Sequence, residues 1–228
     1  GSEMCIRDRH EWTPQTNVNG EGFKYLYAHD KIRGFGQSHQ CSPWVSDYAV
    51  YTFMPEVGKL VVNENDRATK FSHDNEIGRP HYYKVKFDNG ITTEMAPTDR
   101  GVHLRFSYPK GQDAFLVIDG YTDTSEVKID VKNRQIRGWV RNHRFVNHPE
   151  NFRCYFVVQF DKPFADYGTW ENKQNQIFSR QTYGKGKGNG VYLKFSAGSR
   201  VQAKAASSYI SYEQAELNLK RELGADKS

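Results

Sequence analysis

The sequence has few cysteines, no long apolar run and little net charge, and each of these shortages excludes a class of protein. Its 3 cysteines, at positions 5, 41 and 154, are too few and too far apart to predict a disulfide framework. No apolar run is long enough for a membrane-spanning helix or for the core of a signal peptide. The net charge of +5 comes from Lys and Arg interleaved with Asp and Glu, which favours ordinary solvated faces over a nucleic-acid surface.

The motifs that would indicate several common chemistries are incomplete. The Arg-Gly-Phe-Gly run at residues 33–36 matches half of an RNA-recognition strand motif, but polar residues follow where base-stacking aromatics are required. The glycine-rich residues 184–190 are not followed by Lys-Ser or Lys-Thr, so they predict a mobile hairpin loop and not a phosphate-binding loop. No histidine has the spacing of a zinc site, and His73 is interpreted as part of a solvated loop. We therefore expect no nucleic-acid partner, no membrane partner and no metal ligands in this chain.

Aromatic residues and strand-like alternation, by contrast, are abundant and predict an all-β fold. The 14 Phe, 14 Tyr and 4 Trp can fill a sizeable core. Residues 88–90 (Asp-Asn-Gly) form a turn signal between two alternating segments, which predicts a hairpin. The segments that predict strands are residues 83–87, 91–95, 102–108, 127–131, 136–140, 152–160, 191–195 and 201–210. Short strands separated by regular turn signals are typical of a large antiparallel β-sandwich.

The two ends of the chain differ from this pattern. Residues 1–9 have no strand or helix periodicity and resemble a translated adapter or cloning remnant, so we leave them out of the predicted fold. The sandwich is predicted over residues 10–210. Over residues 211–228, Ser211 and Gln214 predict a capping box, and Gly224 ends the helix that follows. A lone helix of this length is marginal in water, so we interpret it as a connector to a further domain.

The segment 38–48 carries the candidate binding residues. Trp44 offers an indole face for the apolar side of a sugar ring, and Asp47 is a carboxylate that accepts hydrogen bonds from vicinal hydroxyls. In a straight strand the two side chains would point to opposite faces. They converge only if Pro43 and Ser46 bend the chain. A buried Trp beside a turn-forming Asp explains the same residues equally well.

Several segments, taken together, resemble the N-terminal domain of glycoside hydrolase family 92, the calcium-dependent exo-α-mannosidases. Their order and spacing over roughly residues 12–217 make the resemblance specific, although each run is weak alone. The runs are Ile32-Arg33-Gly34-Phe35, Ser38-His39-Gln40, Ser42-Pro43-Trp44, Asp47-Tyr48, Met54-Pro55, Phe71-Ser72-His73, Pro80-His81-Tyr82-Tyr83, Glu94-Met95-Ala96-Pro97-Thr98, Arg100-Gly101, His103, Arg105-Phe106, Gly138-Trp139 and Tyr155-Phe156.

The resemblance implies a supersandwich-like N-terminal domain that packs on a C-terminal (α/α)6 barrel, with the active site between them. It implies inverting hydrolysis, in which a carboxylic acid protonates the leaving oxygen and a carboxylate activates water. In the family the catalytic carboxylates and the Ca²⁺ ligands belong chiefly to the barrel, so no catalytic residue and no cofactor is expected in this chain alone. Family members begin with a Gly- and His-rich segment that is replaced here. We therefore expect a chain truncated at both ends, without its first strand and its barrel.

Carried over residue by residue, the resemblance assigns Trp44 as the stacking platform and Asp47 as the hydroxyl acceptor of the sugar pocket. His39 and Ser42 would line the same bend and support them. Residues 100, 103 and 105 match family positions and are candidates for docking of the second domain. The expected partners are mannose-containing glycans and the (α/α)6 domain of a parent enzyme that is periplasmic or extracellular.

Two hypotheses of different classes follow from the sequence, beside a third in which the chain is a purely structural sandwich interaction domain. In the first, the chain is the non-catalytic half of an α-mannosidase that acts on α-mannosides such as N-glycan or mannan chains, and it is inactive alone. In the second, it is a stand-alone carbohydrate-binding β-sandwich module without catalysis. The helix predicted after Ser211 favours the first hypothesis, because it leads away from the sandwich.

Overall fold

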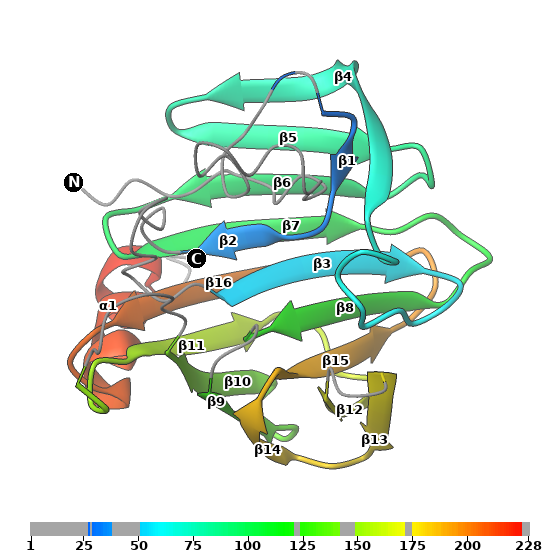
Figure 1. Cartoon of the computed structure of the whole chain (residues 1–228). Coiled ribbons are helices and arrows are strands. Elements are labelled where there is room, and N and C mark those ends of the chain that lie inside the picture. Colours follow the sequence, from blue (N-terminus) through cyan, green and yellow to red (C-terminus); the bar gives the residue numbers. More distant parts are fainter. Residues whose placement is uncertain are drawn as a thin grey trace, which may run out of the picture.

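Two antiparallel sheets and one helix make up the part of the chain that the structure describes. The computed structural model describes residue 27 and residues 29–37, 51–120, 124–141, 149–171 and 175–224. Within these residues the chain forms strands β1 to β16, followed by the helix α1 (Figure 1). The predicted all-β sandwich with a helix at its C-terminal side is confirmed.

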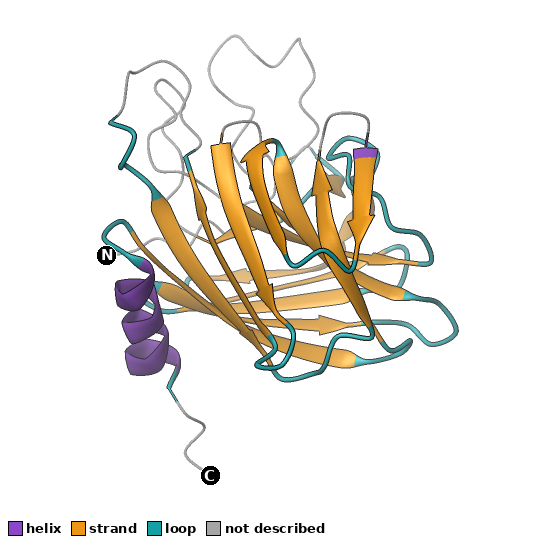
Figure 2. Ribbon diagram, turned by 90° about the horizontal axis from the view of Figure 1, so that it is seen from below, coloured by secondary structure: helices purple, strands orange, loops and turns teal. Residues whose placement is uncertain are grey.

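The ten-stranded sheet has the order β1-β4-β5-β6-β7-β16-β11-β10-β9-β14, and the six-stranded sheet has the order β13-β12-β15-β8-β3-β2. Figure 2 shows the two sheets as separate layers, with α1 at one side. In chain order the elements are β1 (Lys31–Ile32), β2 (Phe35–Gln37), β3 (Tyr51–Val57), β4 (Thr69–Arg79), β5 (Tyr82–Phe87), β6 (Thr92–Pro97), β7 (Gly101–Ser107), β8 (Ala114–Asp119), β9 (Thr124–Asp130), β10 (Gln135–Val140), β11 (Cys154–Phe160), β12 (Asp166–Glu171), β13 (Gln176–Ser179), β14 (Tyr183–Lys187), β15 (Asn189–Phe195), β16 (Arg200–Ser208) and α1 (Tyr212–Leu223).

The core lies between the sheets and is rich in aromatic rings. Tyr51 of β3 stacks on Phe156 of β11 with ring centroids 4.0 Å apart, so the two sheets meet there through parallel rings. Phe35 of β2 packs against Phe87 of β5 at 6.0 Å. These rings are buried, and buried aromatic side chains contribute much of the stability of a sandwich of this size.

Most of the predicted strands are observed, including β5 and β6 with the turn at residues 88–90, where Gly90 has φ 91°. Two interpretations are wrong. Residues 184–190 do not form a hairpin loop, because β14 pairs with β9 and β15 pairs with β8 and β12 in the opposite sheet. His73 does not lie in a loop but in β4, which has an irregular register between Phe71 and Glu76.

The helix begins where the sequence predicts, with one difference. The Ser211 hydroxyl accepts a hydrogen bond from the Gln214 backbone N–H at 3.2 Å. The Gln214 side chain donates instead to Asn218 Oδ1 at 2.9 Å, so this carboxamide turns along the helix rather than back to Ser211. α1 packs on the outer face of the ten-stranded sheet against β7, β11 and β16, where Tyr212 meets the ring of Tyr155 edge-on at 5.0 Å.

A buried arginine fixes the long connection between β3 and β4. The Arg67 side chain has no exposed surface and forms an ion pair with Asp119 of β8 at 2.7 Å. Its Nε donates to the Arg33 carbonyl at 2.9 Å, and its Nη1 donates to the Val62 carbonyl at 2.9 Å. One guanidinium therefore joins the residues before β2, the 58–68 connection and the end of β8.

A buried carboxyl group lies under the start of the same connection. Glu56 of β3 accepts a hydrogen bond from the Val61 backbone N–H at 2.8 Å and is 5% exposed. Burial raises the pKa of Glu56 from 4.5 to about 8, although the Val61 hydrogen bond and the charge of Arg67 act in the opposite direction. The neutral acid is therefore the main form of Glu56 at neutral pH.

We predict that Glu56 makes the folded protein less stable as the pH rises from about 5 to 8. Because folding raises the pKa of this carboxyl, its full contribution to stability is present below the unfolded pKa and is lost as the pH approaches the folded one. The loss is at most about 1.4 kcal/mol per pH unit in that window. Glu56→Gln keeps an acceptor for Val61 and removes the titration. Denaturant unfolding at several pH values should give a smaller pH slope for the variant, and identical slopes would contradict the raised pKa.

Candidate functional site

The four binding residues predicted from the sequence lie outside the described residues. Trp44, Asp47, His39 and Ser42 all fall within residues 38–50, so their assignment stays a prediction. The structure does describe both flanks of this segment. Gln37 is the last residue of β2 and Tyr51 is the first residue of β3, and the two face each other in the antiparallel register. The positions at which segment 38–50 leaves and rejoins the sandwich are therefore known.

Ends of strands from both sheets gather around these two flanks. In the six-stranded sheet, Asp119 at the end of β8 pairs with Thr52, next to Tyr51. In the ten-stranded sheet, Val140 at the end of β10 pairs with Cys154 at the start of β11. The two sheets meet here because Tyr51 stacks on Phe156. We call this side of the sandwich, marked by Gln37, Tyr51, Asp119, Val140 and Cys154, the loop end.

Neutral hydrogen bonds hold the base of segment 38–50. The Tyr51 hydroxyl donates to Gln37 Oε1, and Gln37 Nε2 donates to the Arg100 carbonyl at 3.3 Å. Burial raises the pKa of Tyr51 well above 10, and the nearby Cys154 acts in the same direction. Tyr51 therefore stays a neutral donor throughout the physiological range, and this contact does not change with pH.

The described tryptophans do not offer a stacking face to a ligand. Trp170 is fully buried and Trp139 is 3% exposed. The Arg153 guanidinium lies over the Trp139 ring at 4.1 Å from its centroid, a cation–π contact that covers the ring. If a tryptophan of this protein stacks on a sugar, it is therefore one of those outside the described residues, Trp12 or Trp44.

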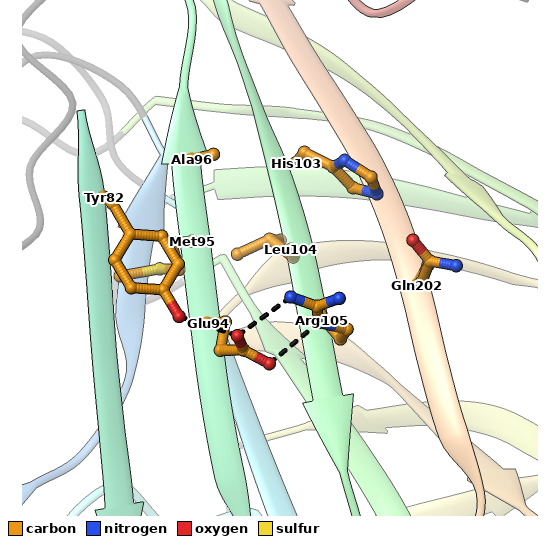
Figure 3. Close-up of a pocket in the computed structure, with 8 residues that line it drawn as sticks. All are labelled: Tyr82, Glu94, Met95, Ala96, His103, Leu104, Arg105 and Gln202. Atoms are coloured by element: carbon orange, nitrogen blue, oxygen red, sulfur yellow. Dashed lines mark hydrogen bonds and ion pairs between the residues drawn. The ribbon is translucent and has the colours of Figure 1, made fainter. Parts of the chain in front are cut away.

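A small pocket lies on the outer face of the ten-stranded sheet, away from the loop end (Figure 3). Arg105 binds Glu94 through two hydrogen bonds of 2.8 Å, and the Tyr82 hydroxyl donates to Glu94 at 2.7 Å. Burial alone would raise the pKa of Glu94, but the bonds from Arg105 and Tyr82 outweigh it and lower the pKa. The volume of the pocket is about 120 Å³, below the roughly 300–1,000 Å³ of ordinary ligand sites.

The three residues proposed for domain docking do not form one cluster. Arg105 and His103 both line the pocket of Figure 3, with Arg105 bound to Glu94. Arg100 precedes β7 and is bound to Glu222 of α1 at 2.9 Å. Both arginines are therefore engaged within the chain, and their guanidinium groups are oriented by carboxylates.

A cluster of ionisable groups around Glu76 was not recognised in the sequence. His73 Nδ1 lies 2.7 Å from Glu76 Oε2, the Tyr83 hydroxyl donates to Glu76 Oε1 at 2.6 Å, and Tyr27 stacks on His73 with centroids 4.0 Å apart. The spacing of His73 and Glu76 would separate them in a regular strand. The irregular register of β4 brings them together, and the sequence carries no clear signal for it.

Two further classes of site are not found in the described part of the chain. No three His, Cys, Asp or Glu side chains among the described residues lie close enough together to hold a metal ion. No helix within the described ranges is long and apolar enough to cross a membrane.

Comparisons with known proteins agree on one family. Residues 10–208 match the glycosyl hydrolase family 92 N-terminal domain. A family GH92 inverting mannosidase from Bacteroides thetaiotaomicron VPI-5482 superposes on 97% of the chain with a TM-score of 0.85 and 34% identity, and the match covers 29% of that protein. A family GH92 α-mannosidase from the same species matches 94% of the chain at a TM-score of 0.74 and 23% identity, over 30% of its own length, which supports the fold alone.

A curated relative supports the same assignment at the level of sequence. An uncharacterized secreted glycosidase of Arthroderma benhamiae is 25% identical over 194 residues, which are 74% of this chain and 24% of the relative. The chain thus spans less than a third of the length of these three relatives. The similarity concerns one domain of larger glycosidases.

We predict that Glu76 keeps the pKa of His73 above its ordinary 6.5. The hydrogen bond to Glu76 is the largest contribution, and burial acts against it. Glu76→Gln removes the negative charge, so the pKa of His73 measured from its imidazole NMR signals should fall. Tyr83→Phe is the matched control, because it removes the hydroxyl that donates to Glu76 and leaves His73 with its carboxylate. An unchanged pKa in Glu76→Gln would contradict this assignment.

Proposed function

The chain belongs to the family of glycosyl hydrolase family 92 N-terminal domains, and from this premise we propose that it is the substrate-shaping domain of an inverting, calcium-dependent exo-α-mannosidase. The parent enzyme acts on α-mannosides such as N-glycan or mannan chains. This domain contributes sugar-binding residues and not the catalytic carboxylates. The observation that carries the proposal is the match over residues 10–208, together with the similarity to an inverting mannosidase at 34% identity.

In this proposal the loop end of the sandwich forms part of the sugar pocket. Trp44 supplies an aromatic face for the C–H side of a mannose ring, and Asp47 accepts hydrogen bonds from two of its hydroxyls. His39 and Ser42 support the bend between them. Two features of the described residues favour this arrangement, namely the fixed positions of Gln37 and Tyr51 and the covered rings of Trp139 and Trp170.

The hydrolytic step is assigned to the second domain of the parent. An inverting enzyme needs a carboxylic acid at the leaving oxygen and a carboxylate that activates water, about 6.5–9.5 Å apart. The contribution of this chain is to bind and orient the sugar, which lowers the barrier by holding the reacting bond in position. Ca²⁺ prefers six to eight oxygen ligands. The described residues do not fit such a site, so we derive no step through the ion.

The parent is proposed to work outside the cytoplasm, since one curated relative is named a secreted glycosidase. His103 and Arg105, which line the pocket of Figure 3, stay candidates for docking of the (α/α)6 domain. Arg100 lies outside this pocket, where it is bound to Glu222 of α1, and stays a separate candidate.

We predict that the isolated chain of 228 residues hydrolyses no α-mannoside, with or without Ca²⁺. The reason is that the proposed acid and base belong to the second domain. The measurement is release of free mannose from mannobioses and from aryl α-mannosides over long incubations. Turnover that co-purifies with the protein and disappears in Asp47→Asn would overturn the division of labour.

We also predict that any binding of methyl α-mannoside or α-linked mannobioses depends on Trp44. Burial of a large apolar side chain contributes about 1.5–3 kcal/mol, so Trp44→Ala should weaken binding by about tenfold or more. Calorimetric titration of wild type and variant measures this. Gln202→Ala, on the outer sheet face, is the control and should bind like wild type.

The same titration tests the alternative of a stand-alone carbohydrate-binding module. Saturable binding by the isolated chain that Trp44→Ala abolishes would favour that alternative. A flat wild-type isotherm at millimolar ligand would exclude it and leave the sugar contacts to the assembled enzyme.

A further inference from the structure

Polar contacts, more than apolar burial, hold α1 on the outer face of the ten-stranded sheet. Ala215 is fully buried, and the other buried residue of the helix is Asn218. Asn218 Nδ2 donates to the Ser207 carbonyl at 2.9 Å. Lys204 Nζ donates to the Gly224 carbonyl at 3.0 Å, just past the last turn. The position of the helix is therefore set largely by directional bonds, which tolerate little displacement.

The Glu222 carboxylate alone accepts three hydrogen bonds from the sheet side of this interface. Its Oε2 accepts hydrogen bonds from the Thr98 hydroxyl and the Arg100 backbone N–H, both at 2.7 Å. Its Oε1 accepts from Arg100 Nη1 at 2.9 Å. One carboxylate in the last turn of α1 thus fixes the turn between β6 and β7. Burial alone would raise the pKa of Glu222, but the bonds from Thr98 and Arg100 outweigh it and keep the carboxyl ionised.

The same turn also contacts the base of segment 38–50. The Arg100 carbonyl accepts a hydrogen bond from the Ser207 backbone N–H at 3.1 Å and a second from Gln37 Nε2 at 3.3 Å. Gln37 is 4% exposed, and its Oε1 accepts from the Tyr51 hydroxyl. Both ends of the Gln37 carboxamide are therefore used, one toward Arg100 and the other toward the first residue of β3.

We propose that Gln37 is a positioning residue that couples the placement of α1, through Arg100, to the two flanks of segment 38–50. If α1 shifts, Glu222 carries the Arg100 backbone with it, and the buried Gln37 amide loses an acceptor that no water replaces in the interior. The carboxamide then reorients, and its bond to Tyr51 changes with it. The contacts Glu222–Arg100, Arg100–Gln37 and Gln37–Tyr51 thus join the outer helix to the loop end through the turn between β6 and β7.

The functional consequence rests on the proposed function. In the proposed parent, α1 leads toward the second domain, and segment 38–50 carries Trp44 and Asp47. The contacts would make the geometry of the sugar-binding residues depend on how the second domain holds α1. The coupling itself does not depend on sugar binding and is measured separately.

The first measurement is hydrogen exchange by mass spectrometry on the full chain. Glu222→Gln keeps the size of the side chain but leaves one acceptor oxygen for three donors. We expect exchange of the amides of β2 and of residues 51–54 to accelerate by about threefold or more. Glu216→Gln is the matched control, because Glu216 also joins α1 to an arginine of the sheet, Arg137 at 3.4 Å, but does not contact Arg100. Equal acceleration in both variants would overturn the proposal.

The second measurement separates coupling from simple loosening of the helix. Gln37→Met keeps the shape of the side chain and removes both of its hydrogen bonds. In that background Glu222→Gln should no longer change exchange at residues 51–54, because coupled residues give non-additive effects. Additive effects would contradict the proposal. If Gln37→Met does not fold, Tyr51→Phe serves instead, since it cuts the last contact and leaves Gln37 bound to Arg100.

Mannoside titration of the same variants distinguishes the two proposals. If wild type binds a mannoside, Glu222→Gln should weaken the affinity by about threefold or more and Glu216→Gln should not. Binding that depends on Trp44 but is equal in the two helix variants would refute the coupling to the site and leave the proposed function intact. Coupled exchange in a chain that binds no mannoside would support the coupling, which does not depend on sugar binding, and would leave the sugar contacts to the assembled enzyme.

Discussion

The buried ion pair of Arg67 and Asp119 is the interaction on which the loop end depends. Its two charges are almost completely removed from water, so neither tolerates the loss of the other. The pair anchors the end of β8, which runs beside β3, and the same guanidinium holds the Arg33 carbonyl ahead of β2. The strands that carry Gln37 and Tyr51 are thereby positioned from outside segment 38–50. Whatever this segment binds, its two flanks are held by contacts that do not involve the ligand.

The contacts that lead from α1 to Tyr51 are charged at the surface and neutral in the interior. Gln37 and Tyr51 are buried, and the Tyr51 hydroxyl donates a hydrogen bond to the neutral Gln37 carboxamide. Glu222 and Arg100, by contrast, form an ion pair at the surface, where the Arg100 side chain is 62% exposed. A buried charge at Gln37 would need a partner of its own. A neutral carboxamide instead satisfies one donor and one acceptor at once. The outer contact is therefore open to solvent and to other polypeptide segments, and the inner one passes a shift of the helix on to Tyr51 without moving a charge.

The sequence predicted the fold better than it predicted the site, for physical reasons. Strands such as β5 and β7 alternate regularly because one face is buried, and this period is local. β4 was missed because its irregular register places Glu76 beside Val85 of β5, and β14 was missed because its glycines leave no side-chain pattern. The pairing of Arg100 with Glu222 spans 122 residues and has no local signal. Trp44 and Asp47 rest on the family resemblance and remain predictions.

Three described carboxyl groups have shifted pKa values that bear on the proposed division of labour between the two domains. A general acid must be protonated before the reaction and must reach the leaving oxygen. Within the described part of the chain, Glu56 is the carboxyl group whose pKa is raised, to about 8. It lies five residues along β3 from Tyr51, about 17 Å at the rise of an antiparallel strand, and it is 5% exposed.

Glu94 and Glu222 have lowered pKa values, because arginines and hydroxyl groups stabilise their charged forms. The group with the raised pKa, Glu56, is therefore remote from Tyr51, and the lowered pKa values of Glu94 and Glu222 favour their ionised forms. The proposed division of labour, in which a second domain supplies the acid for the glycosidic bond, requires no proton from any of these three groups.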